Sequence, residues 1–221
     1  MPTNYSVAHS EAGILATNKL IRNTYTLLSM TLLFSAFTAA ISMFLALPPF
    51  TYLLSLGGAM LLIWLVLPRF ANSAAGIGIV FAITGLMGLG LGPILSMYAS
   101  LPNGPQIIAT ALGGTGIIFL ALSAYALTTR KDFSFMGGFL MVGLLVVLVA
   151  ALANIFLAIP AMSLALSAVI IMLMSGFILY DTGRMVNGGE TNYVMATIGL
   201  YLNIFNIFVN LLQLLGFASD D

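Results

Sequence analysis

Residues 193–216 read YVMATIGLYLNIFNIFVNLLQLLG, an apolar segment interrupted by four amide side chains. About 20 apolar residues allow a helix to cross the roughly 30 Å hydrocarbon core of a bilayer. The amides of Asn203, Asn206, Asn210 and Gln213 have the spacing i, i+3, i+7 and i+10, which places them on one face of a helix. Because amides that face lipid are costly, this face must contact other helices or water. We therefore expect this helix to lie at the centre of the molecule.

The rest of the chain has the same membrane character. It is 61% hydrophobic and only 5% charged, whereas soluble domains carry about 25% charged residues. The runs are too long for membrane strands and do not alternate between polar and apolar residues. The sequence therefore predicts an all-α integral membrane protein with seven transmembrane helices. Their expected ranges are 25–47, 51–68, 74–98, 106–127, 135–158, 162–181 and 193–216.

The basic residues predict the orientation of these helices. All of them precede the first helix or lie in alternate connections, so they fall at one side of the membrane. They are Lys19, Arg22, Arg69, Arg130, Lys131 and Arg184. Positively charged connections stay in the cytoplasm, so we expect a cytoplasmic N-terminus and a C-terminus outside.

Three parts of the chain follow from this division. We expect a polar cytoplasmic tail over residues 1–24, a transmembrane domain over 25–216 and a short acidic end over 217–221. The lipid bilayer is the first expected partner. Because six basic residues balance six acidic ones, the charge gives no indication of nucleic-acid binding.

Two groups of polar or small residues allow more than one interpretation. The amide face is either hydrogen-bonded structure between helices or the wall of a path for water or ions. In the third helix, Gly88 and Gly92 form a GxxxG pattern and Pro93 follows. These residues favour close helix packing, and the alternative is a kink whose free carbonyls face a cavity.

An acidic residue stands at the end of the sixth apolar run, in ILYDTGRM (residues 178–185). If the helix ends near Asp181, this carboxylate lies at the membrane interface, and Arg184 is close enough along the helix to pair with it. One interpretation is a solvated interfacial acid. The other is a carboxylate in a partly dry site, whose protonation changes helix packing.

The residue inventory argues against an enzyme. The only histidine, His9, lies outside the apolar runs, and no second acid accompanies Asp181 in another predicted helix. A serine–histidine pair or an aspartyl dyad within the membrane is therefore not expected. There is no cysteine, and no cluster has the spacing of a metal site. We expect no catalytic residue and no bound cofactor.

Four stretches are similar to a known family. They are NKLIRNTYTLLSMTLLFSA (18–36), TGLMGLGLGPILSMY (84–98), ALGGTGIIFLALSAYALTTRKDFSFMGGFL (111–140) and GGETNYVMATIGLYLNIFNIF (188–208). With them the chain resembles the Bax inhibitor family, also called the transmembrane Bax inhibitor motif family. The strings TTRKDFSFMGG and GGETNYV are unusual, and the similarity extends along nearly the whole chain.

The resemblance implies seven helices with the last one central, and it implies two functions. Bacterial members of the inner membrane are associated with the membrane-anchored AAA protease FtsH, as a substrate and as a restraint on its attack on other membrane proteins. Other members are pH-sensitive calcium leaks, in which aspartates on the sixth and seventh helices share a proton. Asp181 matches the first of these aspartates, but Asn203 stands at the second.

Because an amide does not titrate, this chain lacks the coupled carboxylate pair of the leak proteins. The leading hypothesis is therefore an inner-membrane protein that binds and modulates FtsH. The alternative is a calcium or proton leak in which Asp181 acts as a latch against the last helix and calcium is the transported ion. The sequence leaves the oligomeric state open.

Overall fold

The fold was described from a computed structural model that covers residues 4–218, with side chains described from Leu15 onward. Its regular secondary structure over these residues is helical throughout. The elements are α1 (Asn4–Phe44), α2 (Phe50–Leu61), a π-helical turn η1 (Leu62–Val66), α3 (Leu67–Phe70), α4 (Ala74–Ala99), α5 (Gly104–Thr129), α6 (Met136–Leu157), α7 (Pro160–Val186) and α8 (Tyr193–Phe217).

Seven helical spans among the described residues are long and apolar enough to cross a membrane, which confirms the predicted number. The second span is composite, because α2, η1 and α3 continue one another from Phe50 to Phe70. Pro160 stands at the start of α7, where a missing N–H is tolerated. Residues 219–221 of the predicted acidic end lie outside the described residues.

Two helix ends differ from the sequence expectation. The helix α1 begins at Asn4 and is continuous into the first span, so most of the predicted tail is helical backbone. The helix α7 continues to Val186, beyond the predicted end at residue 181. In α7, Asp181 and Arg184 end the apolar run but not the helix, and both side chains have polar partners.

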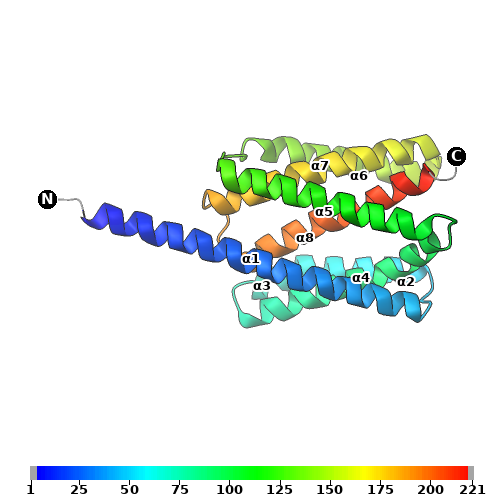
Figure 1. Cartoon of the computed structure of the whole chain (residues 1–221), viewed down its shortest axis with the longest axis horizontal. Helices are drawn as coiled ribbons and strands as arrows, with labels where there is room; N and C mark the ends of the chain where they lie inside the picture. Colours follow the sequence, from blue (N-terminus) through cyan, green and yellow to red (C-terminus); the bar gives the residue numbers. More distant parts are fainter. Residues whose placement is uncertain (1–3, 219–221) are drawn as a thin grey trace.

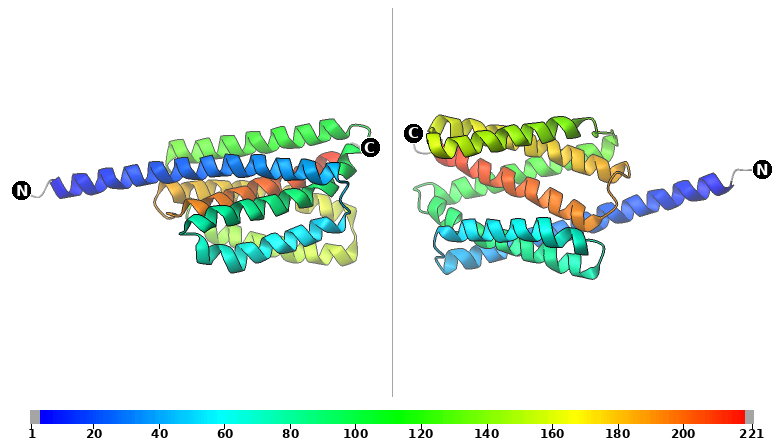
Figure 2. Two further views of the ribbon diagram at one scale, coloured as in Figure 1. Left: turned by 90° about the horizontal axis from the view of Figure 1, so that it is seen from below. Right: turned by 180° about the vertical axis from the view of Figure 1, so that it is seen from behind.

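The last helix is the centre of the fold. Figures 1 and 2 show α8 between a layer of α1, α2 and α4 and a second layer of α5, α6 and α7. It contacts α1, α4, α5 and α7. Its most apolar window is 56% buried inside the protein, compared with 11% for the peripheral α6. The position of α8 thus agrees with the expectation drawn from its amide face.

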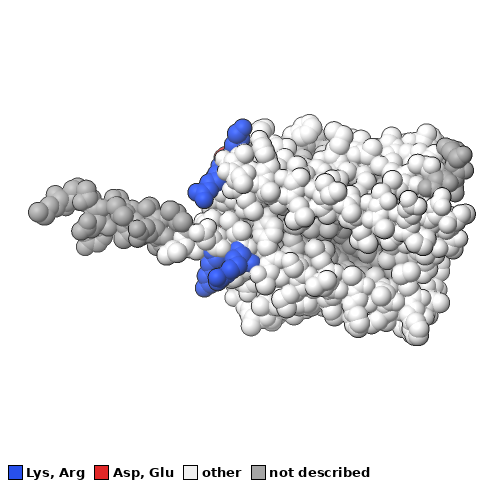
Figure 3. Space-filling model, viewed as in Figure 1, with Lys and Arg blue, Asp and Glu red and all other residues white. Residues whose placement is uncertain are grey.

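The charged side chains of the described residues gather at one end of this bundle. Figure 3 shows lysine and arginine at the end where α1 emerges, while the residues drawn in white over the rest of this face are uncharged. We call this the basic end. Figure 1 shows that the N-terminal part of α1 projects beyond the bundle at this end, whereas α8 ends near the opposite end.

Small residues bring α1 and α4 into close contact. A Cβ atom at Gly88 would overlap the hydroxyl of Thr38 and the carbonyl of Ser35, and a Cβ atom at Gly92 would overlap the side chain of Ser42. Only glycine leaves room for this approach, so Gly88 and Gly92 lie where α1 and α4 come closest together.

The proline of α4 explains one polar contact in this interface. Pro93 has no N–H, so the carbonyl of Leu89, four residues earlier, loses its helical hydrogen bond. The hydroxyl of Ser42 in α1 donates to this carbonyl at 2.7 Å. The carbonyl that Pro93 frees is therefore bound to the neighbouring helix.

Replacement of this donor tests the arrangement. Ser42→Ala is expected to lower the free energy of unfolding by about 1–3 kcal/mol, because the Leu89 carbonyl would be buried without a partner. The measurement is denaturant-induced unfolding in detergent micelles. Ser29→Ala is the control on the same helix, since the Ser29 hydroxyl is exposed and bonds its own helix. Equal stability of the two variants would contradict a stabilising hydrogen bond between Ser42 and the Leu89 carbonyl.

Candidate functional site at the basic end

The carboxylate of Asp181 joins α7 to α8. It lies within α7, five residues before the helix ends, and is half-buried. Its Oδ2 atom accepts a hydrogen bond of 2.8 Å from Nδ2 of Asn203, which is 6% exposed in α8. Gly199, one turn before Asn203, leaves space for the carboxylate, because a Cβ there would stand 3.3 Å from Oδ2. Asn203 and Gly199 of α8 therefore form the binding surface for the Asp181 carboxylate.

A small recess of about 220 Å³ opens beside this contact. Its polar walls are Asp181, Arg184 and Glu190, and α8 supplies the remaining lining from Met195 to Gly199. The recess lies at the basic end, where α7 leads into α8. Asp181 thus faces a polar space on one side and the central helix on the other.

Arg184 does not form the ion pair with Asp181 that its position along the helix suggested. Within the described part of the chain, its Nη2 atom lies 3.6 Å from Oε2 of Glu190 and donates to the carbonyl of Gly189 at 2.7 Å. Its guanidinium also lies over the ring of Tyr180, 5.6 Å from the ring centre. Tyr180 lies one turn earlier in α7 itself. The loop after α7 turns back and provides Gly189 and Glu190, which spacing along a single helix could not indicate.

The loop between α7 and α8 is fixed by two asparagines. Asn192 caps α8 by accepting hydrogen bonds from the amides of Val194 and Met195. Its amide also donates to the carbonyl of Ala71 and so holds the turn between α3 and α4. Asn187 reaches the carbonyl of Lys131 in the loop after α5. Several connections at the basic end are thereby tied into one unit.

The predicted amide face does not act as a single network. Asn206 and Asn210 each donate to a carbonyl of α8 itself, four residues earlier in both cases. Gln213 accepts a hydrogen bond from Ser167 of α7 at 2.9 Å. Asn203 and Gln213 thus connect α8 to α7 at two different levels, while the two amides between them are satisfied locally.

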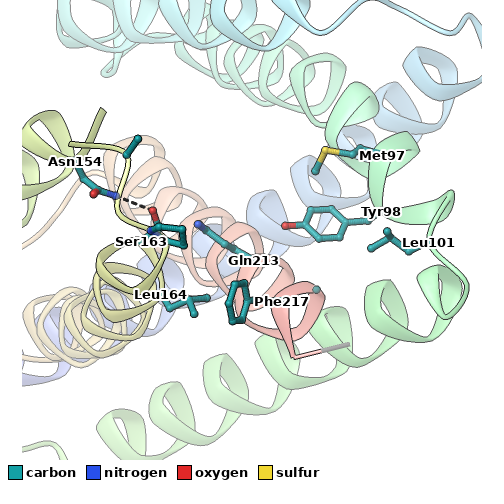
Figure 4. A pocket seen from close by; sticks show the side chains of 11 residues that line it. Met97, Tyr98, Leu101, Asn154, Ser163, Leu164, Gln213 and Phe217 are labelled. Carbon is teal, nitrogen blue, oxygen red and sulfur yellow. Dashed lines mark hydrogen bonds between the residues drawn. The ribbon is translucent and has the colours of Figure 1, made fainter. Parts of the chain in front are cut away.

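Gln213 also lines a pocket of about 530 Å³ at the end of the bundle opposite the basic end. Figure 4 shows its side chain between Ser163 and the ring of Tyr98, whose hydroxyl points toward it. Asn154 completes the polar lining, and its amide donates to Ser163 at 2.7 Å. The side chains described around this pocket are all uncharged.

Tyr201 was not singled out from the sequence, although it is 1% exposed at the centre of the protein. Its hydroxyl lies 2.7 Å from that of Ser35 in α1 and donates to the carbonyl of Thr84 in α4 at 3.4 Å. The sequence contains one pattern that could have indicated polar contacts between α1 and its neighbours, a row of hydroxyl residues on one face of α1. These residues are Thr31, Ser35, Thr38 and Ser42.

Comparisons with known proteins show that this chain is similar to several bacterial proteins. It is 52% identical over 216 residues to a protein of Escherichia coli K12 named "Modulator of FtsH protease YccA", covering 98% of each chain. A relative with the same identity in E. coli O6:H1 is named "Inner membrane protein YccA". An uncharacterized protein of Pseudomonas aeruginosa is 46% identical, with 91% of this chain and 90% of that protein covered.

The relatives and the seven spans identify this chain as a multi-pass protein of the bacterial inner membrane. Residues 17–220 match the family described as "Inhibitor of apoptosis-promoting Bax1". This match covers the first membrane span from residue 17 onward and the other six spans completely. The chain therefore belongs to the Bax inhibitor family.

Proposed function

We propose that this protein binds the membrane-anchored protease FtsH and modulates its attack on other membrane proteins. The observation that carries the proposal is the 52% identity, over 98% of both chains, to a protein named as a modulator of that protease. The proposed role is one of binding, and it requires no catalytic residue and no cofactor in this chain.

The shape of the basic end supports this proposal. By the positive-inside rule, the end that carries the lysine and arginine side chains faces the cytoplasm, which gives a cytoplasmic N-terminus and a C-terminus outside. The N-terminal part of α1 then projects into the cytoplasm, beyond the other helices (Figure 1). Chain ends that few contacts hold are the usual points of attack for proteases. The projecting segment is therefore the proposed handle for the protease.

Removal of residues 2–17 tests the handle. The deletion retains Lys19 and Arg22, so the orientation signal before the first span is kept. We expect the shortened protein to be degraded more slowly by FtsH than the full chain, with a half-life longer by about fivefold or more, since engagement would lose its starting point. Pulse-chase measurement in cells with and without the protease gives the result.

Deletion of residues 219–221 at the other end of the chain is the matched control and is expected to leave the half-life unchanged. Co-purification of the full chain with FtsH from membranes tests binding separately. An unchanged half-life after removal of residues 2–17 would exclude the handle. Absence of co-purification from membranes that contain both folded proteins would contradict binding itself.

One observation favours a second candidate, a pH-sensitive leak for calcium or protons. Asp181 holds α8 through Asn203 beside a polar recess, which is the arrangement of a latch with one titrating partner. In this case, calcium flux into vesicles that contain only this protein changes between mildly alkaline and mildly acidic pH. Asp181→Asn abolishes that pH dependence, because an amide does not titrate. Flux equal to that of empty vesicles, with folded protein present, would reject this candidate.

A further inference from the structure

A groove of about 470 Å³ lies between α1 and α5, away from the Asp181 site. Both helices pack against α8, and among the described residues their backbones do not approach each other closely. Their side chains meet at the rings of Tyr25 and Phe119, whose centres lie 5.9 Å apart. The central helix therefore forms the floor of the groove, through residues that include Tyr201 and Phe208. Ala36 and Ala40 of α1 stand at one rim and Leu112 of α5 stands at the other, and all three are exposed.

The lining has no polar group to offer a ligand. Its side-chain hydroxyls belong to Ser35, Thr115 and Tyr201. Ser35 and Tyr201 bind each other at 2.7 Å, and Thr115 donates to the carbonyl of Ala111 in its own helix at 2.7 Å. The remaining side chains are apolar, and the lining contains no charged residue. Only hydrocarbon can fill this space without leaving a polar group unpaired.

The groove opens toward one leaflet of the bilayer. Its α1 residues lie between Leu32 and Met43, in the second half of the span that ends at Phe44. Its α5 residues begin at Ile108, and all of them except Phe119 lie in the first half of an antiparallel span. Most of the lining from both helices therefore lies in the half of the membrane away from the basic end, where lipid chains of that leaflet surround the protein.

We propose that this groove binds an acyl chain of a phospholipid from the leaflet opposite the basic end. Small side chains on both walls, Ala36, Ala39 and Gly116, leave a space within the size range of ligand pockets. A helix of about 10 Å diameter would fill the same volume with about one turn, so the groove is too small to seat a partner's transmembrane helix. A flexible chain follows the groove and gains van der Waals contacts along both walls.

A photoreactive lipid tests the proposal. The purified protein is placed in vesicles at a low ratio of protein to lipid, with a phosphatidylethanolamine that carries a diazirine on its acyl chain. After illumination, labelled residues are located by mass spectrometry. We expect label on the buried floor of the groove at Tyr201 and Phe208, in addition to the outer faces of the peripheral helices.

Two variants close the groove from opposite walls. Gly116 lines the groove, and an added Cβ there meets no atom within 4 Å, so the side chain of Gly116→Leu begins in open space and is expected to occupy the groove. Ala36→Leu does the same from the exposed rim of α1 and serves if the first variant fails to fold. Gly113→Leu is the control, because Gly113 is equally open on the same helix but does not line the groove.

The outcomes separate clearly. Label on the α8 floor is expected to fall by about fivefold or more in Gly116→Leu and Ala36→Leu, since the space itself is filled, and to stay unchanged in Gly113→Leu. An unlabelled floor in the wild-type protein would overturn the proposal, as would equal labelling in the filled variants. Cross-links from the rim to a second copy of the chain, in place of lipid adducts, would also overturn it.

Discussion

Gly92→Leu is expected to lower the free energy of unfolding by about 3 kcal/mol or more, the largest loss among the substitutions considered. The new side chain would occupy the position of the Ser42 side chain, and its Cβ would stand 3.0 Å from the backbone nitrogen of Met43. Backbone cannot rotate away as a flexible side chain does, so α1 and α4 must separate. The same movement would break the hydrogen bond from Ser42 to the Leu89 carbonyl.

The loss is measured by thermal and denaturant-induced unfolding in detergent micelles. Gly78→Leu, on the same helix, is the control, because an added Cβ there meets no atom within 4 Å. It is expected to remain within about 1 kcal/mol of the wild-type protein, as surface substitutions usually do. A Gly92→Leu protein as stable as the Gly78→Leu protein would show that α1 and α4 are not in close contact.

Asn203→Leu is expected to give the second largest loss, about 2–3 kcal/mol. The substitution removes the amide that donates to Asp181 and leaves a half-buried carboxylate without this partner at the junction of α7 and α8. The penalty comes from the unpaired acid more than from the lost contact. Unfolding in micelles is again the measurement, and limited proteolysis of the loop between α7 and α8 reports the local effect.

Two further variants decide whether the Asp181 contact is the cause. Asn206→Leu makes the same change one turn away, where the amide only bonds the carbonyl of Leu202 in its own helix, and it is expected to cost less. The double variant Asp181→Leu/Asn203→Leu removes both partners and is expected to recover stability relative to Asn203→Leu. Equal losses for Asn203→Leu and Asn206→Leu would refute the role assigned to the Asp181 contact.

Features repeated along a helix were predictable from the sequence. The amide spacing in residues 193–216 indicated a central helix because polar groups must avoid lipid, and α8 is the most buried span. The Gly88 and Gly92 pair indicated close packing for a similar reason. In each case a period within one helix defines a face, and the bilayer determines which way that face points.

Features that depend on the meeting of distant segments were not predictable in this way. The spacing of Asp181 and Arg184 suggested an ion pair, but the loop after α7 brings Glu190 to the arginine instead. Tyr201 appeared as one more aromatic residue in an apolar run. Its partners, Ser35 and Thr84, lie 166 and 117 residues away along the chain. The groove between α1 and α5 arises because the backbones of these two helices stay apart, which no local pattern in the sequence indicates.

The measurement that tests the proposed function most directly is the rate at which purified FtsH degrades a second membrane protein in vesicles, with and without this protein. We expect the rate of degradation of the second protein to fall as the ratio of this protein to FtsH rises. We also expect this protein to be degraded slowly enough to persist while that rate is lowered. A rate that stays constant at every ratio, with this protein folded and in the correct orientation, would contradict a role as modulator of FtsH.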